Sequence, residues 1–243
     1  MEKVSIVIPC YNEQEAIPTV IPRTIDCLNK LREDKLIPEF ELIVVNDKST
    51  DESVSMLQEF KEVRLLHTNG TGRGYGKALK HGFSNAQGEW IGFFDVDNSY
   101  RPEDIALFVK EITKGESDFI MGQRYFTEKG MSFTRGFGNW FYVVLAKVLY
   151  GSYLDDVCSG YRFFNRRYLD QITSIPEDGL DFSIHLTLKM ISQKTPIKPI
   201  PIQYDPRIGE SKLSVLSDGW AFLKVLLFLK LRSFGGAVKH SRV

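Results

Sequence analysis

The sequence predicts an α/β fold built around a mostly parallel sheet. Short apolar runs rich in β-branched residues alternate with longer amphipathic stretches, which is the pattern of βαβ units. Polar turn residues follow directly after several of these runs. At 243 residues and 43% hydrophobic content, the chain is long enough to bury a substantial core.

The expected elements follow in order along the chain. Apolar runs predict strands at 4–10, 41–47, 63–68, 90–97 and 118–124, and amphipathic stretches predict helices at 14–32, 53–61, 74–86 and 102–113. No repeat or low-complexity linker interrupts residues 1–212, so we expect one domain there. After Asp205 comes a polar loop and then an apolar, helix-like segment. We expect residues 213–243 to form an amphipathic basic tail.

Composition narrows the possible classes of function. The 31 Lys and Arg residues balance 31 Asp and Glu residues, so we expect no nucleic-acid partner. Three widely spaced cysteines without a C-x-x-C pair argue against a disulfide framework or zinc site and favour a reducing, cytoplasmic environment. The N-terminal apolar run is too short for a secretory signal. The later apolar segments contain lysines, so no spanning helix is expected.

Two aspartates follow the apolar run Trp90–Phe94. Asp95 and Asp97 leave the predicted strand at its C-terminal end, where ligands of α/β sheets usually bind. Paired carboxylates suit Mg²⁺ or Mn²⁺, which take hard oxygen ligands and complete their coordination with water and phosphate. For an isolated pair, the alternative is a solvated turn.

Two other predicted strands also end in polar residues. The first strand runs into the polar turn Pro9–Glu13, which includes Tyr11, and the second strand ends at Asp47. Taken alone, each could be a strand followed by a helix cap. Because parallel strands end along one edge, we expect Glu13, Asp47 and the aspartate pair to face a shared crevice.

The glycine-rich segment 69–77 matches neither a Walker A loop nor a G-x-G-x-x-G register, which disfavours an ATPase or a NAD enzyme. Its backbone amides, with Arg73 or Lys77, could still lie near an anion. The alternative is a simple flexible loop.

Seven ordered motifs resemble family 2 glycosyltransferases, in particular the dolichyl or polyprenyl phosphate hexose synthases. They are SIVIPCYNE, VVNDKSTDES, GRGYGKALKHGF, FFDVDNSYRPEDI, GQRY, DDVCSGYRFFNRRYL and PIQYDPRIGESKLS. The resemblance spans roughly residues 4–215 and implies a GT-A nucleotide-sugar-binding fold. It also implies metal-dependent, inverting transfer of a hexose from a donor of the GDP-mannose or UDP-glucose type to a polyprenyl phosphate at the cytoplasmic membrane face.

The resemblance also implies residue roles. Pro9, Tyr11, Glu13 and Asp47 would hold the nucleoside, Asp95 and Asp97 the metal and diphosphate, Arg124 and Arg135 the acceptor phosphate, and Arg207 and Lys212 would lie on a closing loop that binds acceptor or diphosphate. Ser99 stands where the mannosyl enzymes typically have glutamine, which leaves the donor base open. His185 stands where the family often has glutamate, and we assign it no catalytic role.

The C-terminal tail combines apolar and basic residues. Trp220, Phe222 and Phe228 accompany five basic residues and one acidic residue, a composition typical of a helix lying in a membrane interface. The alternatives are a core helix or a contact with a partner subunit, such as a membrane-anchoring one. The segment 137–150 could form a second amphipathic surface or pack on the sheet.

Two other functions stay open. A transferase acting on a saccharide hydroxyl would need a general base, for which Asp156 is the nearest candidate. The chain lacks the Q-x-x-R-W motif of processive polysaccharide synthases. A non-catalytic nucleotide-sugar-binding subunit would be expected to have lost the paired aspartates, which this chain keeps.

Overall fold

The computed structural model describes residues 3–124, 133–210 and 215–237. Its centre is a seven-stranded sheet with strand order β3-β2-β1-β4-β6-β5-β7. The strands are β1 (Val4–Cys10), β2 (Phe40–Asn46), β3 (Val63–His67), β4 (Trp90–Phe93), β5 (Phe119–Arg124), β6 (Arg162–Asn165) and β7 (Lys198–Ile202). The α-helices are α1 (Ile17–Glu33), α2 (Ser53–Gln58), α3 (Tyr75–Asn85), α4 (Ile105–Lys114), α5 (Phe133–Tyr150), α6 (Leu169–Thr173), α7 (Asp181–Ser192) and α8 (Val215–Ala237).

The sheet is mostly parallel, which confirms the predicted fold class. Strand β1 lies between β2 and β4 and is parallel to both, while β3 is parallel to β2 and β7 to β5. Among the described strands, β6 alone runs antiparallel to its neighbours β4 and β5. Because β1, β2 and β4 point the same way, the segments that follow them meet at one edge of the sheet.

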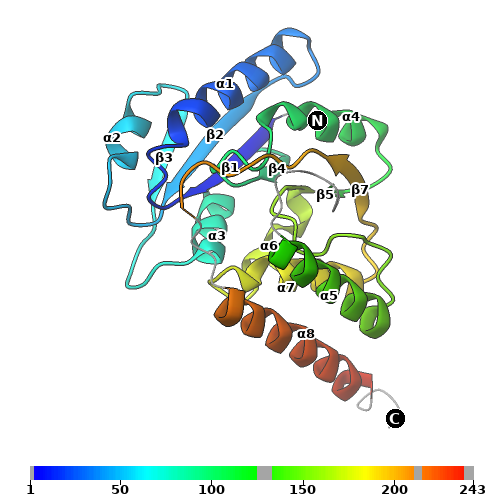
Figure 1. Ribbon diagram of the computed structural model, residues 1–243. Helices are drawn as coiled ribbons and strands as arrows, with labels where there is room; N and C mark the ends of the chain where they lie inside the picture. Colours follow the sequence, from blue (N-terminus) through cyan, green and yellow to red (C-terminus); the bar gives the residue numbers. More distant parts are fainter. Residues whose placement is uncertain (1–2, 125–132, 211–214, 238–243) are drawn as a thin grey trace.

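Helices cover both faces of the sheet (Figure 1). α1, α2 and α4 lie on one face, and α3, α6 and α7 on the other, each layer with its own apolar core. Gly82 in α3 faces Val7 and Val45 so closely that a Cβ would collide with both side chains. α3 therefore lies directly on β1 and β2, next to the edge where these strands end.

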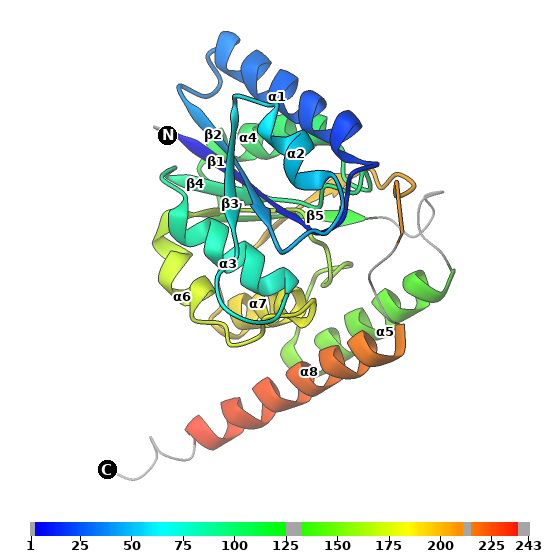
Figure 2. The same ribbon diagram turned by 90° about the vertical axis from the view of Figure 1, so that its left-hand side faces the viewer.

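Helices α5 and α8 form an outer pair beyond α7, and they lie side by side in both ribbon views (Figure 2). Tyr142 of α5 donates a hydrogen bond to the Gly219 carbonyl at 2.7 Å, and Tyr150 donates to the Leu226 carbonyl at 2.6 Å. Val143 of α5 and Leu226 of α8 are buried in the core of this layer. Among the described residues, no helix has the length and apolar character needed to cross a membrane.

Candidate active site

A cavity of about 640 Å³ lies at the C-terminal edge of β1, β2 and β4. The predicted residues Pro9, Tyr11, Glu13, Asp47, Asp95, Asp97, Arg124 and Arg207 all line it. The expectation of a shared crevice is therefore confirmed for Glu13, Asp47, Asp95 and Asp97. The Arg135 side chain and the whole of Lys212 lie outside the described residues.

The aspartate pair sits on the turn after β4. Asp97 accepts hydrogen bonds at Oδ1 from the Ser99 amide, at 2.9 Å, and from the Ser99 hydroxyl, and at Oδ2 from Arg207. Asp95 has a buried Oδ1 with no hydrogen-bond partner among the described residues. Desolvation raises the pKa of Asp95, and the adjacent charge of Asp97 raises it further. A buried, unpartnered carboxylate oxygen beside a second carboxylate fits a hard divalent cation.

Arg207 spans the cavity from a loop that is distant in sequence. Its Nη1 donates to Asp97 Oδ2 at 2.7 Å, and its Nη2 donates to Glu13 Oε1. The Ile208 amide donates to the Asp97 carbonyl at 2.9 Å, which ties the loop to the aspartate turn. Glu13, Asp97 and Arg207 thus form a single charged cluster. The sequence had assigned them separately to the nucleoside, the metal and the closing loop.

Asp47 orders the glycine-rich segment. Its Oδ1 accepts from the Thr68 hydroxyl at 2.7 Å and its Oδ2 from the Gly74 amide at 2.6 Å. The neighbouring Asn46, whose Oδ1 accepts from the Ser49 amide at 2.9 Å, stabilises the turn that follows β2. Asn46 therefore has a structural role, because its side chain holds the turn beside Asp47.

Arg73 and Lys77 are the two basic residues of the glycine-rich segment, and Arg73 lines the cavity. Its guanidinium lies over the Tyr11 ring, 4.0 Å from the ring centroid. Lys77 instead donates to the Thr71 carbonyl at 3.0 Å, so it helps to close the loop. The segment is therefore a loop held by its own lysine, and it presents one arginine to the pocket.

Arg124 forms a buried bidentate ion pair with Asp156. Its Nε lies 2.6 Å from Oδ2 and its Nη2 lies 2.9 Å from Oδ1. Burial alone would raise the pKa of the fully buried Asp156, but the charge and hydrogen bonds of Arg124 outweigh burial and hold that pKa below its usual value. A carboxylate engaged in this way is a poor proton acceptor. This engagement disfavours Asp156 as a general base.

The remaining wall of the cavity comes from α5, α7 and α8. Phe137 and Tyr142 of α5, Leu180 beside α7, and Gly219 and Phe222 of α8 line it. Sequence analysis did not assign these residues to the site, although it recognised the amphipathic pattern of the segments that form α5 and α8. His185 does not line the cavity, and it pairs with Glu177.

Solved structures share the fold. Glucosyl-3-phosphoglycerate synthase from Mycobacterium tuberculosis, in complex with Mn²⁺, UDP and phosphoglyceric acid, superposes with a TM-score of 0.71. The match covers 94% of this chain and 78% of that one, at 20% sequence identity. The likeness confirms the GT-A-like arrangement.

Characterised relatives are more similar in sequence. The low-salt glycan biosynthesis hexosyltransferase Agl6 of Haloferax volcanii is 27% identical over 227 residues, which is 92% of this chain and 52% of the relative. The undecaprenyl-phosphate 4-deoxy-4-formamido-L-arabinose transferase of Proteus mirabilis is 36% identical over 119 residues, 47% of this chain and 35% of the relative. The chain thus spans about half of the first relative's length, and the match to the second covers about a third of it.

The region of the chain that matches a protein-family model contains much of the pocket. The model of glycosyl transferase family 2 matches residues 5–173. This range contains β2 to β6 and all of β1 except Val4. It also contains several residues that line the cavity: Asp95, Asp97, Glu13, Asp47 and Arg124. The chain is therefore a member of glycosyl transferase family 2.

Proposed function

We propose that the protein moves a hexose, with inversion, from a nucleotide sugar to a polyprenyl phosphate at a membrane surface, with Mg²⁺ or Mn²⁺ as cofactor. One observation carries this proposal. A single cavity joins the Asp95 and Asp97 pair to Arg124 and is walled by α5 and α8, two helices whose outer faces are apolar. Such a cavity combines the features needed for a diphosphate, a phosphate and a lipid.

On the donor side, Asp95 and Asp97 are the residues that would hold the metal. A divalent ion on the diphosphate would stabilise the leaving group by several kcal/mol without a proton donor. We propose that four residues lining the cavity contact the nucleoside: Pro9, Tyr11, Glu13 and Asp47. The Mycobacterium tuberculosis synthase of the same fold has been crystallised with Mn²⁺ and with Mg²⁺ together with UDP, which supports the cofactor.

On the acceptor side, a phosphate is already an anion and needs no strong general base. Asp156 instead holds Arg124 in a fixed orientation through two hydrogen bonds, so that the guanidinium can position an anion. We propose that Arg135 and Lys212 complete this anion site. The name of the Proteus mirabilis relative, an undecaprenyl-phosphate transferase, supports a polyprenyl phosphate acceptor.

The exposed side chains of α5 and α8 support the proposal that the protein binds a membrane surface. On α5, Phe137, Trp140, Phe141, Val144 and Val148 are exposed, and on α8 Trp220, Leu227, Phe228 and Leu231 are exposed. Their spacing places each set along one stripe of its helix. The Lys224 ammonium lies 5.6 Å from the Trp220 ring centroid, as for a lysine whose charge stays at the surface of a lipid layer. A membrane-anchoring subunit is a second partner for this face.

The donor and acceptor are tested by one assay. The protein with Mn²⁺ is incubated with a panel of labelled nucleotide sugars and a short polyprenyl phosphate, and the mixture is extracted with organic solvent. We expect label from one donor to enter the organic phase. Label that moves only to an added soluble saccharide would support the hydroxyl-acceptor function instead.

The acceptor site gives a residue-level prediction. Arg135→Ala should raise the apparent KM for polyprenyl phosphate by roughly ten- to a hundredfold, because one charge-assisted hydrogen bond is lost. Slow hydrolysis of the donor by water should stay nearly unchanged, since it does not use the acceptor. The two rates are measured in parallel. Equal loss of both would assign Arg135 to the donor or to the fold.

The membrane surface gives a second prediction. The double variant Trp220→Gln, Leu231→Gln should reduce co-sedimentation with anionic liposomes at least about tenfold, because two large apolar side chains no longer enter the lipid. Both residues are more than half exposed, at 59% and 70%, so the fold should persist. The matched control is Leu36→Gln, which changes an exposed leucine just after the C-terminal end of α1. Unchanged sedimentation of the double variant would contradict the proposed surface.

A further inference from the structure

Arg207 occupies the position of a cation between two carboxylates. Asp97 and Glu13 are 5% and 8% exposed, and Arg207 donates one guanidinium hydrogen bond to each of them. Carboxylates this far from water need a positive partner to stay charged. Among the described residues, Arg207 thus places a positive charge directly against Asp97 Oδ2.

The same arginine uses the oxygen that a metal would need. Asp97 Oδ1 already accepts two hydrogen bonds from Ser99, and Oδ2 accepts the bond from Arg207 at 2.7 Å. Both oxygens of this carboxylate are thus engaged, whereas Asp95 keeps a buried oxygen without a partner among the described residues. Asp95 and Asp97 would hold a divalent ion, and that ion would compete with the Arg207 guanidinium for the negative charge of Asp97.

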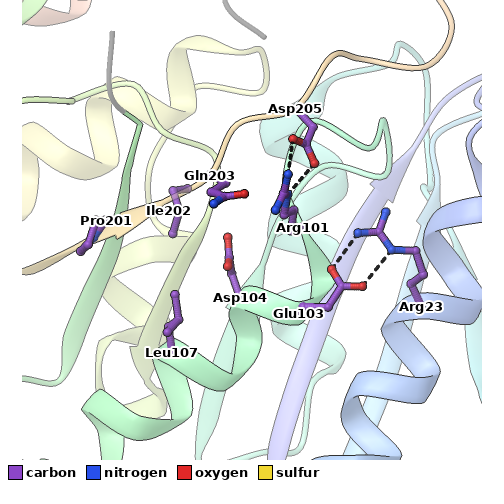
Figure 3. Close-up of a pocket in the computed structure, with 9 residues that line it drawn as sticks. All are labelled: Arg23, Arg101, Glu103, Asp104, Leu107, Pro201, Ile202, Gln203 and Asp205. Carbon is purple, nitrogen blue, oxygen red and sulfur yellow. Dashed lines mark hydrogen bonds and ion pairs between the residues drawn. The ribbon is translucent and has the colours of Figure 1, made fainter. Parts of the chain in front are cut away.

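The loop that carries Arg207 is fastened outside the pocket. Asp205 accepts a bidentate ion pair from Arg101, with Nε–Oδ2 at 2.6 Å and Nη2–Oδ1 at 2.7 Å, and the Asp205 amide donates to the Ser99 carbonyl at 3.0 Å. Figure 3 shows this pair at the rim of a second cavity of about 690 Å³, next to the separate pair of Arg23 and Glu103. The pair of Arg101 and Asp205 therefore helps to hold the loop on the aspartate turn, and neither residue lines the active-site cavity.

We propose that Arg207 is an internal counter-cation that competes with the divalent ion for Asp97. This inference rests on the proposed metal role of Asp95 and Asp97. Because the guanidinium and a divalent ion repel each other and share Asp97, we expect metal to bind weakly in the absence of nucleotide. A nucleoside diphosphate brings an anion that can receive the released Arg207, so the two ligands strengthen each other's binding. The arginine thereby makes metal loading depend on the donor.

The test measures metal binding directly, with the full chain and without turnover. Free Mn²⁺ is followed by electron paramagnetic resonance during titration, with and without UDP or GDP. In the absence of nucleotide, Arg207→Gln should bind Mn²⁺ about ten- to a hundredfold more tightly than wild type, the factor carried by a charge-assisted hydrogen bond. It should also lose most of the gain that the nucleotide gives. Arg207→Lys keeps the competing charge and should stay near wild type.

Two further variants separate competition from general effects. Asp205→Asn weakens the anchor but leaves the pocket charges in place, so Mn²⁺ should bind more tightly by a smaller factor. Arg64→Gln removes an arginine near the N-terminal end of β3, where it pairs with Glu41, and should leave Mn²⁺ affinity unchanged. In chelator, Arg207→Gln should melt at a lower temperature than wild type, and Mn²⁺ should raise its melting temperature by more than that of wild type.

Unchanged or weaker Mn²⁺ affinity in a folded Arg207→Gln variant would overturn the inference while leaving the proposed metal site intact. A different outcome reports on the proposed function. If wild type and Arg207→Gln both fail to bind Mn²⁺ even with UDP and with GDP, the metal role of the aspartate pair is itself wrong and the inference falls with it.

Discussion

Asp97→Asn should abolish glycosyl transfer while the protein stays folded. A metal on the diphosphate is worth several kcal/mol to the departing group, so its loss should lower kcat by roughly a thousandfold or more. The amide keeps an oxygen that can accept from Ser99, but it pairs poorly with Arg207. We expect a loss of about 1–3 kcal/mol in the free energy of unfolding, the usual effect of removing one partner of a buried charged hydrogen bond.

The measurement combines single-turnover kinetics with denaturant unfolding. Asp51→Asn is a suitable control, because Asp51 also follows a strand-end segment and accepts backbone hydrogen bonds but does not line the cavity. It should keep most of the transfer activity. Full activity of Asp97→Asn in the presence of a chelator would remove the aspartate pair from the mechanism.

Asp156→Asn should cause the largest loss of stability. It leaves the charge of Arg124, whose side chain is 11% exposed, without its buried partner. Breaking such a pair costs about 3–5 kcal/mol. The neighbouring pair of Asp155 and Lys147 is largely exposed, so Asp155→Asn should change stability by no more than about 1 kcal/mol. Urea unfolding of the two variants compares a buried and an exposed ion pair at adjacent positions.

The pH dependence of stability follows from the same pair. Because the pKa of Asp156 is lower in the folded state than its ordinary value, the pair stabilises the protein at neutral pH. This contribution falls as the pH drops below the unfolded pKa of about 3.9 and toward the lower folded pKa. Asp156→Asn should therefore lose less stability than wild type on acidification. An equally steep acid loss in both proteins would contradict this assignment.

The sequence predicted the parallel half of the sheet well because each strand there is a local apolar run. Residues 4–10 form β1 as expected, whereas the run 90–97 yields a strand only to Phe93. The chain then turns at the aspartates, and Asn98 adopts a positive φ of 68°. Aspartate and asparagine favour such turns. The same aspartates that indicated the site therefore also end the strand earlier than predicted.

Two strands were not predicted. β6 (Arg162–Asn165) has four residues, and its apolar pair is flanked by polar ones; its antiparallel partners are remote in sequence. β7 contains Pro199 and Pro201, which lower the strand signal. β7 lies at the edge of the sheet and pairs only with β5 among the described strands. An edge strand tolerates proline because its outer N–H groups need no partner.

The site was predictable where it depends on strand ends and not where it depends on long-range pairing. The carboxylates after β1, β2 and β4 meet because parallel strands end together. The contacts of Arg207 span 110 and 194 residues, and no local pattern indicates them. The helices that wall the cavity were recognisable as amphipathic, but periodicity does not say which neighbour each apolar stripe contacts.

The most direct test of the central claim is to identify the bond that is formed. The protein, Mn²⁺, the preferred nucleotide sugar and a short polyprenyl phosphate are followed by phosphorus nuclear magnetic resonance. Transfer to the lipid phosphate predicts that the monoester signal of the polyprenyl phosphate converts to a phosphodiester signal, in step with the release of nucleoside diphosphate. Consumption of the donor with an unchanged monoester signal, while the sugar appears on a hydroxyl or in water, would contradict the account.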